Sequence, residues 1–331
     1  MVPFSILDLS PVAEGSSVRQ SLESSARMAK KAEEFGYKRF RLAEHHGMPG
    51  IASAATSVVI GHVGAATTRI RIGSGGIMLP NHSPLVIAEQ FGTLEALFPG
   101  RVDLGLGRAP GTDMRTAQAL RRNLEAGANS FPNDVVELQQ LLDTPVENQA
   151  ILAVPGNSSH IPIWLLGSSL YSAQLAAMLG LPYAFASHFA PDMLLDAIAI
   201  YRDRFQPSAT LDKPYVMVGV MGAVAATDDD ARYHFTSAEQ QFVNLRRNVR
   251  GPFPRPVAEN FWSPMEKMNV EHTLRYAVVG SPQTAEAKLT AFLEETQADE
   301  VIISMPIHDI EVRLRSVELF AGLGSFMRAA A

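Results

Sequence analysis

Short stretches in which apolar and polar residues alternate recur along the chain and predict β-strands. The clearest series begins at Arg39, where Phe40 and Leu42 alternate with arginines. A helix of small residues is expected from Ser53, as its cap, to Ala66. Two more strands, at 70–72 and 102–106, enclose a second helix at 84–98. Successive strand–helix–strand units of this kind indicate parallel strands whose carboxyl ends lie together.

The remaining chain extends this alternation to eight strands, with further ones at 4–9, 161–166, 183–187, 215–225 and 301–304. The order predicts an α/β fold, a (β/α)8 TIM barrel with insertions after strands four and seven. Residues 145–159 lack any period and are expected to lie over the barrel mouth. Residues 250–264 contain four prolines and are expected to form a mobile lid. No repeat or linker divides the chain, so we predict one domain over residues 1–331.

Composition narrows the kind of protein. A chain of 331 residues that is 47% hydrophobic can bury a sizeable core, and its net charge of −6 argues against a nucleic-acid partner. The absence of cysteine excludes disulfides, thiol catalysis and cysteine metal sites. No apolar run is long enough to span a bilayer, and no leader precedes the first strand. We therefore expect a soluble, cytoplasmic protein without a membrane partner.

Histidines cluster at predicted strand ends, and His45 and His46 are adjacent. Neighbouring residues on a strand point to opposite faces, so only one of the two can face the barrel mouth directly. A metal site built with His82 and His188 is the competing interpretation. Adjacent histidines cannot both ligate without distortion, and no supporting carboxylate is evident in the sequence, so we predict no metal.

An anion site is predicted at the ends of strands four and five. Arg108 ends a strand, where a guanidinium suits a phosphate through paired hydrogen bonds. Ser168, Ser169 and Ser172 open the next helix, whose first amides favour an anion. Plain helix capping would need only one serine. Tyr171 is placed to stack on the bound group or cover it.

Several motifs together resemble the bacterial luciferase-like flavin monooxygenases, over most of the chain. They are AEHHG, GSGGIMLPNHSP, the FPGR turn, LGLGRAPGTD, GSSLYSA and GLP, in this order. The resemblance implies a TIM barrel that binds reduced FMN, supplied by a separate flavin reductase, and uses O2 to oxidise a small organic substrate. It is closer to single-subunit relatives than to the light-emitting enzymes.

The resemblance also implies roles for individual residues. His45 takes the catalytic position, and Ser10 joins the flavin-binding residues already identified. The Gly75–Gly76 bond is expected to be cis and to bulge against the flavin ring, which glycine eases by lacking a side chain. The small-residue helix after strand two is expected to form a homodimer interface.

Departures from the family pattern leave alternatives open. Gly107 stands where the light-emitting enzymes have a reactive cysteine, and Ser168 where they have an acidic residue, so luminescence is not expected. A deazaflavin-dependent hydride-transfer enzyme of the same superfamily remains an alternative. A non-catalytic flavin-binding protein is another, although the presence of His45 argues against it.

Overall fold

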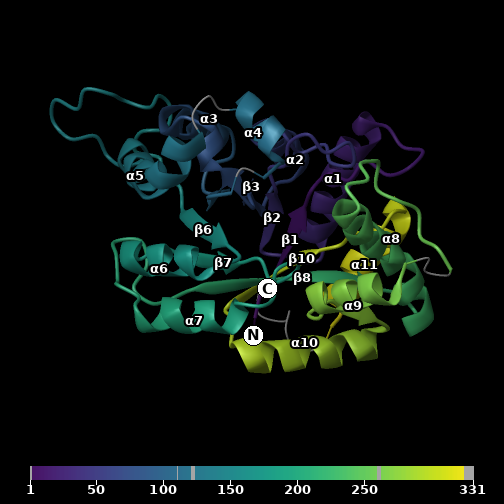
Figure 1. Ribbon diagram of the computed structural model, residues 1–331. Helices are drawn as coiled ribbons and strands as arrows, with labels where there is room; N and C mark the ends of the chain where they lie inside the picture. The colour runs from purple at the N-terminus through teal and green to yellow at the C-terminus, as the bar shows by residue number, and fades with distance from the viewer. Residues whose placement is uncertain (1, 110, 121–123, 259–261, 324–331) are drawn as a thin grey trace.

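Eight parallel strands close into a barrel in the computed structural model, which describes residues 2–109, 111–120, 124–258 and 262–323 (Figure 1). The barrel closes because β10 pairs with both β1 and β8, with Phe4 opposite Val301 and Met217 opposite Glu300. The barrel strands are β1 (Phe4–Asp8), β2 (Arg39–Leu42), β3 (Arg71–Ser74), β5 (Val102–Gly107), β6 (Ile163–Gly167), β7 (Tyr183–Phe185), β8 (Val216–Val224) and β10 (Glu300–Ser304). The predicted TIM barrel is confirmed.

Helices surround the barrel, and α8, α9 and α10 gather on one side of it (Figure 1). Local sequence sets several of their ends. Ser17 and Gln20 form a capping box at α1, Gly180 ends α6 with φ at 61°, and Pro282 opens α10. The helices are α1 (Val18–Glu34), α2 (Thr56–Ala66), α3 (Pro84–Leu97), α4 (Met114–Leu120), α5 (Leu124–Leu142), α6 (Leu170–Leu179), α7 (Leu194–Asp203), α8 (Asp228–Arg246), α9 (Pro264–Thr273), α10 (Pro282–Thr296) and α11 (Ile310–Ala321).

The alternation in β2 places its apolar residues against the helices and its arginines inside the barrel. Phe40 and Leu42 belong to the large core between strands and helices. Arg39 is 7% exposed and Arg41 is fully buried. A smaller apolar cluster lies within the barrel around Trp164, and it comprises Leu7, Ala43, Trp164, Ala184, Met217 and Ile302.

Ion pairs fill the end of the barrel where the strands begin. Arg39 bridges two buried carboxylates, donating from Nη1 to Asp103 at 2.5 Å and from Nε to Glu300 at 3.0 Å. Arg71 donates to the other oxygen of Asp103 at 2.7 Å. Tyr215 donates to Glu300 at 2.9 Å. This layer satisfies the buried carboxylates and closes that end of the barrel.

Three local features differ from the sequence predictions. Two short strands, β4 (Ile77–Met78) and β9 (Val278–Gly280), flank the barrel, and β4 runs into a single 3-10 turn, η1 (Leu79–Asn81). The proline at 264, expected inside an irregular run, instead opens α9, where a missing amide hydrogen costs nothing. Ser53 does not cap α2, because its hydroxyl donates to the Ala43 carbonyl at 2.6 Å and the helix begins at Thr56.

The expectation that residues 145–159 cover the barrel mouth is wrong. This irregular segment joins the end of α5 to the start of β6, so it enters the barrel from the opposite end. It packs on α3, where a Cβ on Gly92 would lie 2.3 Å from the Cα of Gly156. Such close backbone approach requires glycine at both positions.

The segment that follows α8 does cross the mouth. Phe253, which is 2% exposed, donates its amide to the Val12 carbonyl at 2.7 Å and accepts from the Glu14 amide at 2.9 Å. Arg250 pairs with Asp113 at 2.8 Å, which ties this segment to the loop after β5. Among the described residues, no helix has the length and apolar character needed to cross a membrane.

Candidate active site

A cavity of about 440 Å³ opens at the carboxyl ends of the barrel strands, where barrel enzymes build their active sites. Apolar side chains form much of its wall, including Leu9, Met217, Phe185 and Phe253. The structure brings most of the predicted site residues to this cavity. They are His45, Gly75, Gly76, Arg108, Ser168, Ser169 and Ser172.

One wall of the cavity consists of glycine backbone. The Gly75–Gly76 peptide bond is cis, as expected. A Cβ on Gly75 would lie 2.7 Å from Leu7 Cδ1, and one on Gly76 would lie 2.7 Å from the Gly105 carbonyl oxygen. At Gly76 the close atom belongs to the backbone, so the packing requires glycine there, whereas at Gly75 the Leu7 side chain would have to move. The cavity therefore has a side-chain-free face between the end of β3 and the start of β4.

Arg108 and the start of α6 meet at another part of the cavity. The Arg108 guanidinium lies 4.0 Å from the centre of the Tyr171 ring, and its side chain is exposed. Ser169 is the N-cap of α6, yet its side chain makes no capping hydrogen bond. The serines at this helix start are therefore not explained by capping. Helix amides, hydroxyls and a guanidinium at one place form a typical anion site.

Two imidazoles line the cavity, and each has a buried nitrogen atom without a hydrogen-bond partner in the described chain. The Nδ1 atoms of His45 and His188 are buried and make no hydrogen bond to any described residue. Burial lowers the pKa of both side chains, that of His188 to about 4. Both rings are therefore neutral at pH 7. Buried polar atoms without partners are rare in proteins, so these two histidines distinguish this wall of the cavity.

Sequence reasoning missed His188 as a site residue of this cavity. Its ring fits against Gly219 of β8, where a Cβ would lie 2.2 Å from Nδ1. The adjacent Ser187 donates its hydroxyl to the Gly219 carbonyl at 2.7 Å, which fixes the strand end. The available signal was its place directly after strand six, the same signal that identified His45.

Glu44 accounts for the orientation of His46, the second histidine of the adjacent pair. It accepts from His46 Nε2 at 2.6 Å, from His82 Nε2 at 2.9 Å and from the Met78 amide at 2.9 Å. Burial raises the pKa of Glu44, but the hydrogen bonds from His82 and His46 outweigh it and hold the pKa below its usual value. The adjacent histidines thus diverge, as predicted, and the sequence expectation of no supporting carboxylate is corrected. Glu44 fixes the loop that carries β4.

Two predicted residues do not reach the cavity wall. The Ser10 hydroxyl is buried at 2.8 Å from Ser25 Oγ, and Ser25 donates in turn to Asp8 at 2.5 Å. Its side chain turns inward beneath α1 because Asp8 and Ser25 provide polar partners there. Tyr171 packs on Arg108 behind the cavity. It therefore contacts the predicted anion site through Arg108.

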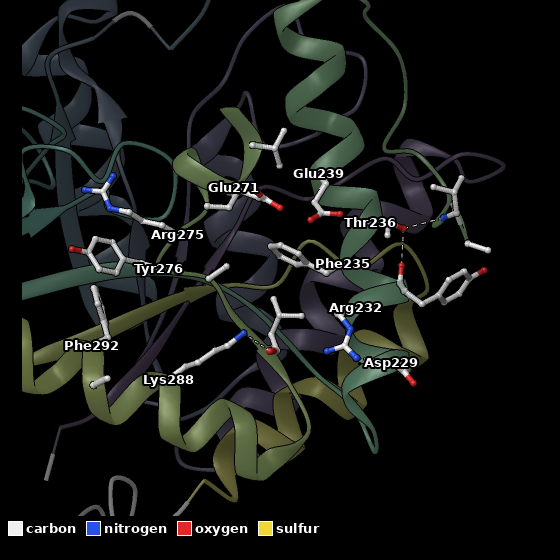
Figure 2. A pocket seen from close by; sticks show the side chains of 18 of the residues that line it. Asp229, Arg232, Phe235, Thr236, Glu239, Glu271, Arg275, Tyr276, Lys288 and Phe292 are labelled. Carbon is white, nitrogen blue, oxygen red and sulfur yellow. Dashed lines mark hydrogen bonds and ion pairs between the residues drawn. The ribbon is translucent and has the colours of Figure 1, made fainter. Parts of the chain in front are cut away.

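A second hollow of about 730 Å³ lies between α8, α9 and α10, away from the glycine wall (Figure 2). Several of its polar groups already have partners. Lys288 donates to the Val279 carbonyl at 2.8 Å, and Arg232 pairs with Asp229 on the same helix. It is lined by residues on both sides of positions 259–261, which lie outside the described chain. The smaller cavity is the candidate site, because the unpaired imidazoles and the glycine wall lie there. Within the described ranges, no group of three or more histidine or acidic side chains is arranged to hold a metal ion.

Comparison with known proteins agrees with this geometry. The sequence model of the luciferase-like monooxygenase family matches residues 2–300. A protein of Escherichia coli (strain K12) named luciferase-like monooxygenase is 54% identical over 320 residues, covering 96% of each chain. The N-acetyl-S-alkylcysteine monooxygenase of Bacillus subtilis (strain 168) is 40% identical over 252 residues, covering 74% of this chain and 75% of its own. The crystal structure of apo-MsnO8 matches with a TM-score of 0.90 at 32% identity, covering 98% of each chain.

The chain belongs to the luciferase-like monooxygenase family. Membership makes it an oxidoreductase of the monooxygenase type. It also agrees with the position of the cavity at the strand ends.

Proposed function

We propose that the protein is a flavin-dependent monooxygenase that uses reduced FMN and O2 to oxidise a small organic substrate. The observation that carries this proposal is the arrangement of one cavity, with an anion site at Arg108 and α6 and a glycine wall at Gly75–Gly76. FMN carries a planar ring at one end and a phosphate at the other, which match these two parts of the cavity. Free FMN would be reduced by a separate flavin reductase.

The residues present fit such a cofactor. Arg108 would hold the phosphate together with the hydroxyls of Ser168 and Ser169, and the α6 dipole would add to this. The glycine wall would accept one face of the ring without a side chain intervening. Bound reduced FMN supplies two electrons, so that one atom of O2 enters the substrate and the other leaves as water.

The two imidazoles supply proton chemistry beside the ring. Because His45 and His188 are neutral at pH 7 and line the cavity, each can accept a proton or share a hydrogen bond through a ring nitrogen. The apolar wall and Phe253 limit the entry of water. His45 is the catalytic residue of this proposal, and it lies close enough to His188 to contribute to the lowered pKa of that side chain.

An anaerobic titration tests the proposal. Reduced FMN should bind with saturation, and riboflavin, which lacks the phosphate, should bind more weakly. On addition of O2, the complex should consume oxygen and release hydrogen peroxide when no substrate is present. As the control, the titration is followed by absorbance and repeated with a deazaflavin in place of FMN. Hydride transfer with the deazaflavin alone, and no binding of reduced FMN, would show that the alternative enzyme class is correct.

The proposal includes a homodimer. The outward face of α2 carries Ala55, Val58, His62 and Ala65, and Val58 is 72% exposed. On the neighbouring helix α3, Val86 and Leu97 are also exposed. Exposed apolar residues on two adjacent helices favour a two-fold contact with a second copy. Gly64, by contrast, serves the fold itself, since a Cβ there would lie 2.6 Å from Phe98.

A further inference from the structure

The floor of the cavity holds a buried guanidinium without hydrogen-bond partners. Arg41 is fully buried, yet it lines the cavity from below the glycine wall, with its Cβ 3.1 Å from the position of a Cβ on Gly75. None of Nε, Nη1 and Nη2 forms a hydrogen bond with the residues that the structure describes. A buried charge is normally paired and hydrogen-bonded, so three free donors on one side chain are unusual.

The surroundings of Arg41 in the described chain provide an aromatic face and a carboxylate but no hydrogen bond. Its guanidinium carbon lies 4.2 Å from the centre of the Trp164 ring, within the apolar cluster inside the barrel. The nearest carboxylate oxygen, on Asp103, is 3.8 Å from Nη2, beyond hydrogen-bond distance. Asp103 already accepts hydrogen bonds from Arg39 and Arg71.

Arg41 belongs to a connected group of charged side chains at this end of the barrel. Four side-chain cations surround two carboxylates in one connected group, formed by Lys38, Arg39, Arg41, Arg71, Asp103 and Glu300. Burial lowers the pKa of Arg41 to about 10, so the side chain still carries its charge at pH 7. Lys38 and Arg71 are partly exposed, so the buried members are two guanidinium groups and two carboxylates. Arg41 is the member of the group that borders the cavity.

We propose that Arg41 is an anion-binding residue at the cavity floor, and that it receives a planar, negatively charged group with two adjacent acceptor atoms. The guanidinium fork matches such a group through two parallel hydrogen bonds. Two sources offer this chemistry. One is a carboxylate on the organic substrate, whose apolar part would contact the cavity wall. The other is the reduced flavin ring, which carries negative charge over N1 and the C2 carbonyl. Only this second source rests on the proposed function.

Trp164 provides a reporter that requires neither flavin nor turnover. The chain has two tryptophans, so a Trp262→Phe background leaves Trp164, in contact with Arg41, as the single fluorophore. The probes are hexanoate and 1-hexanol, which share a carbon chain and differ in charge. If the source is a carboxylate, hexanoate should change the fluorescence with saturation and bind more tightly than 1-hexanol. Arg41→Met should then weaken hexanoate about ten- to a hundredfold and leave 1-hexanol unchanged.

The flavin arm compares the two redox states in the same variants. Oxidised FMN has a neutral ring, so Arg41→Met should weaken reduced FMN about tenfold more than oxidised FMN. That ratio corresponds to a fall of about 30 mV in the midpoint potential of the bound flavin. Arg41→Lys keeps the charge without the fork, and it should retain part of whichever preference the native protein shows.

The results separate the two proposals. If reduced FMN does not bind but hexanoate is preferred over 1-hexanol, the monooxygenase proposal fails and the anion site stands. If Arg41→Met does not fold, the proposal is tested by comparing Arg41→Lys with the native protein in their preference for hexanoate or reduced flavin. The anion site is refuted if neither preference exists, or if a preference does not change in either Arg41 variant. Arg41 would then have only a structural role, packing on Trp164 near Asp103.

Discussion

Acid should destabilise the folded protein through His188, and the size of the effect follows from its burial. Burial, and secondarily the charge of the neighbouring His45, lower the pKa of His188 to about 4 from an ordinary value near 6.5. The unfolded chain therefore takes up a proton near pH 6.5, which the folded protein does not take up until about pH 4. The contribution of neutral His188 to the free energy of unfolding is complete above pH 6.5 and is lost as the pH falls toward 4.

The expected loss is large enough to measure. Each pH unit between the two pKa values costs about 1.4 kcal/mol, so the free energy of unfolding should fall by about 2–3 kcal/mol between pH 7 and pH 4.5 from this residue alone. His188→Asn should lack that component. Urea unfolding at pH 7, 6, 5 and 4.5 would measure it, with the native protein and the variant compared at each pH.

A matched control separates this effect from general acid sensitivity. His160 is exposed before β6 and lies outside the proposed dimer face, so His160→Asn should follow the native pH dependence. The reasoning is refuted if the native protein and His188→Asn lose stability in parallel over this range. Parallel curves would mean that His188 is protonated in the folded state at the same pH as in the unfolded chain.

Three further predictions follow from the cavity and its surroundings. Arg108→Ala should weaken FMN about ten- to a hundredfold by calorimetry, since it removes hydrogen bonds to a charged group, and equal losses for riboflavin would contradict this. His45→Ala should bind reduced FMN almost normally while product formation falls about 10²–10⁴-fold and peroxide replaces it; unchanged coupling of oxygen to product would contradict the role of His45. Val58→Asp should convert a dimer into monomers in sedimentation experiments, and a native protein that is already monomeric at micromolar concentration would refute the interface.

The barrel could be predicted from sequence because its strands have two buried faces and recur between helices. Because both faces of each strand are buried, the sequence pattern does not indicate which face points into the barrel and which contacts the helices. In β2, alternation of Phe40 and Leu42 with arginines is typical of a strand with one wet face, and it gives no sign that Arg39 and Arg41 point into the barrel. Arg39 is inside because carboxylates from β5 and β10 accept its hydrogen bonds there, on strands distant in sequence.

The site shows the same division between local and distant information. Gly75, Gly76 and the serines of α6 lie in short motifs, and their position at strand ends could be predicted. Glu44 became interpretable only when the fold brought His82 beside it, since 38 positions separate them in the chain. Ser10 was misplaced because its partner, Ser25, belongs to a helix that covers it. Such partners follow from packing, which the periodicity of one segment does not contain.

Three polar groups at different depths in the barrel differ in how many hydrogen bonds they form. Glu300, near the beginning, accepts from Ser5, Arg39 and Tyr215. Arg41, in the middle, has only a distant carboxylate and an aromatic face. At the mouth, His188 has a buried nitrogen with no partner at all among the described residues. Groups whose hydrogen bonds are made within the protein stabilise the fold. A buried group without a partner can instead form its hydrogen bonds with a ligand, which offsets the cost of its desolvation. Substitutions at Glu300 should therefore mainly change stability, and those at Arg41 should mainly change binding.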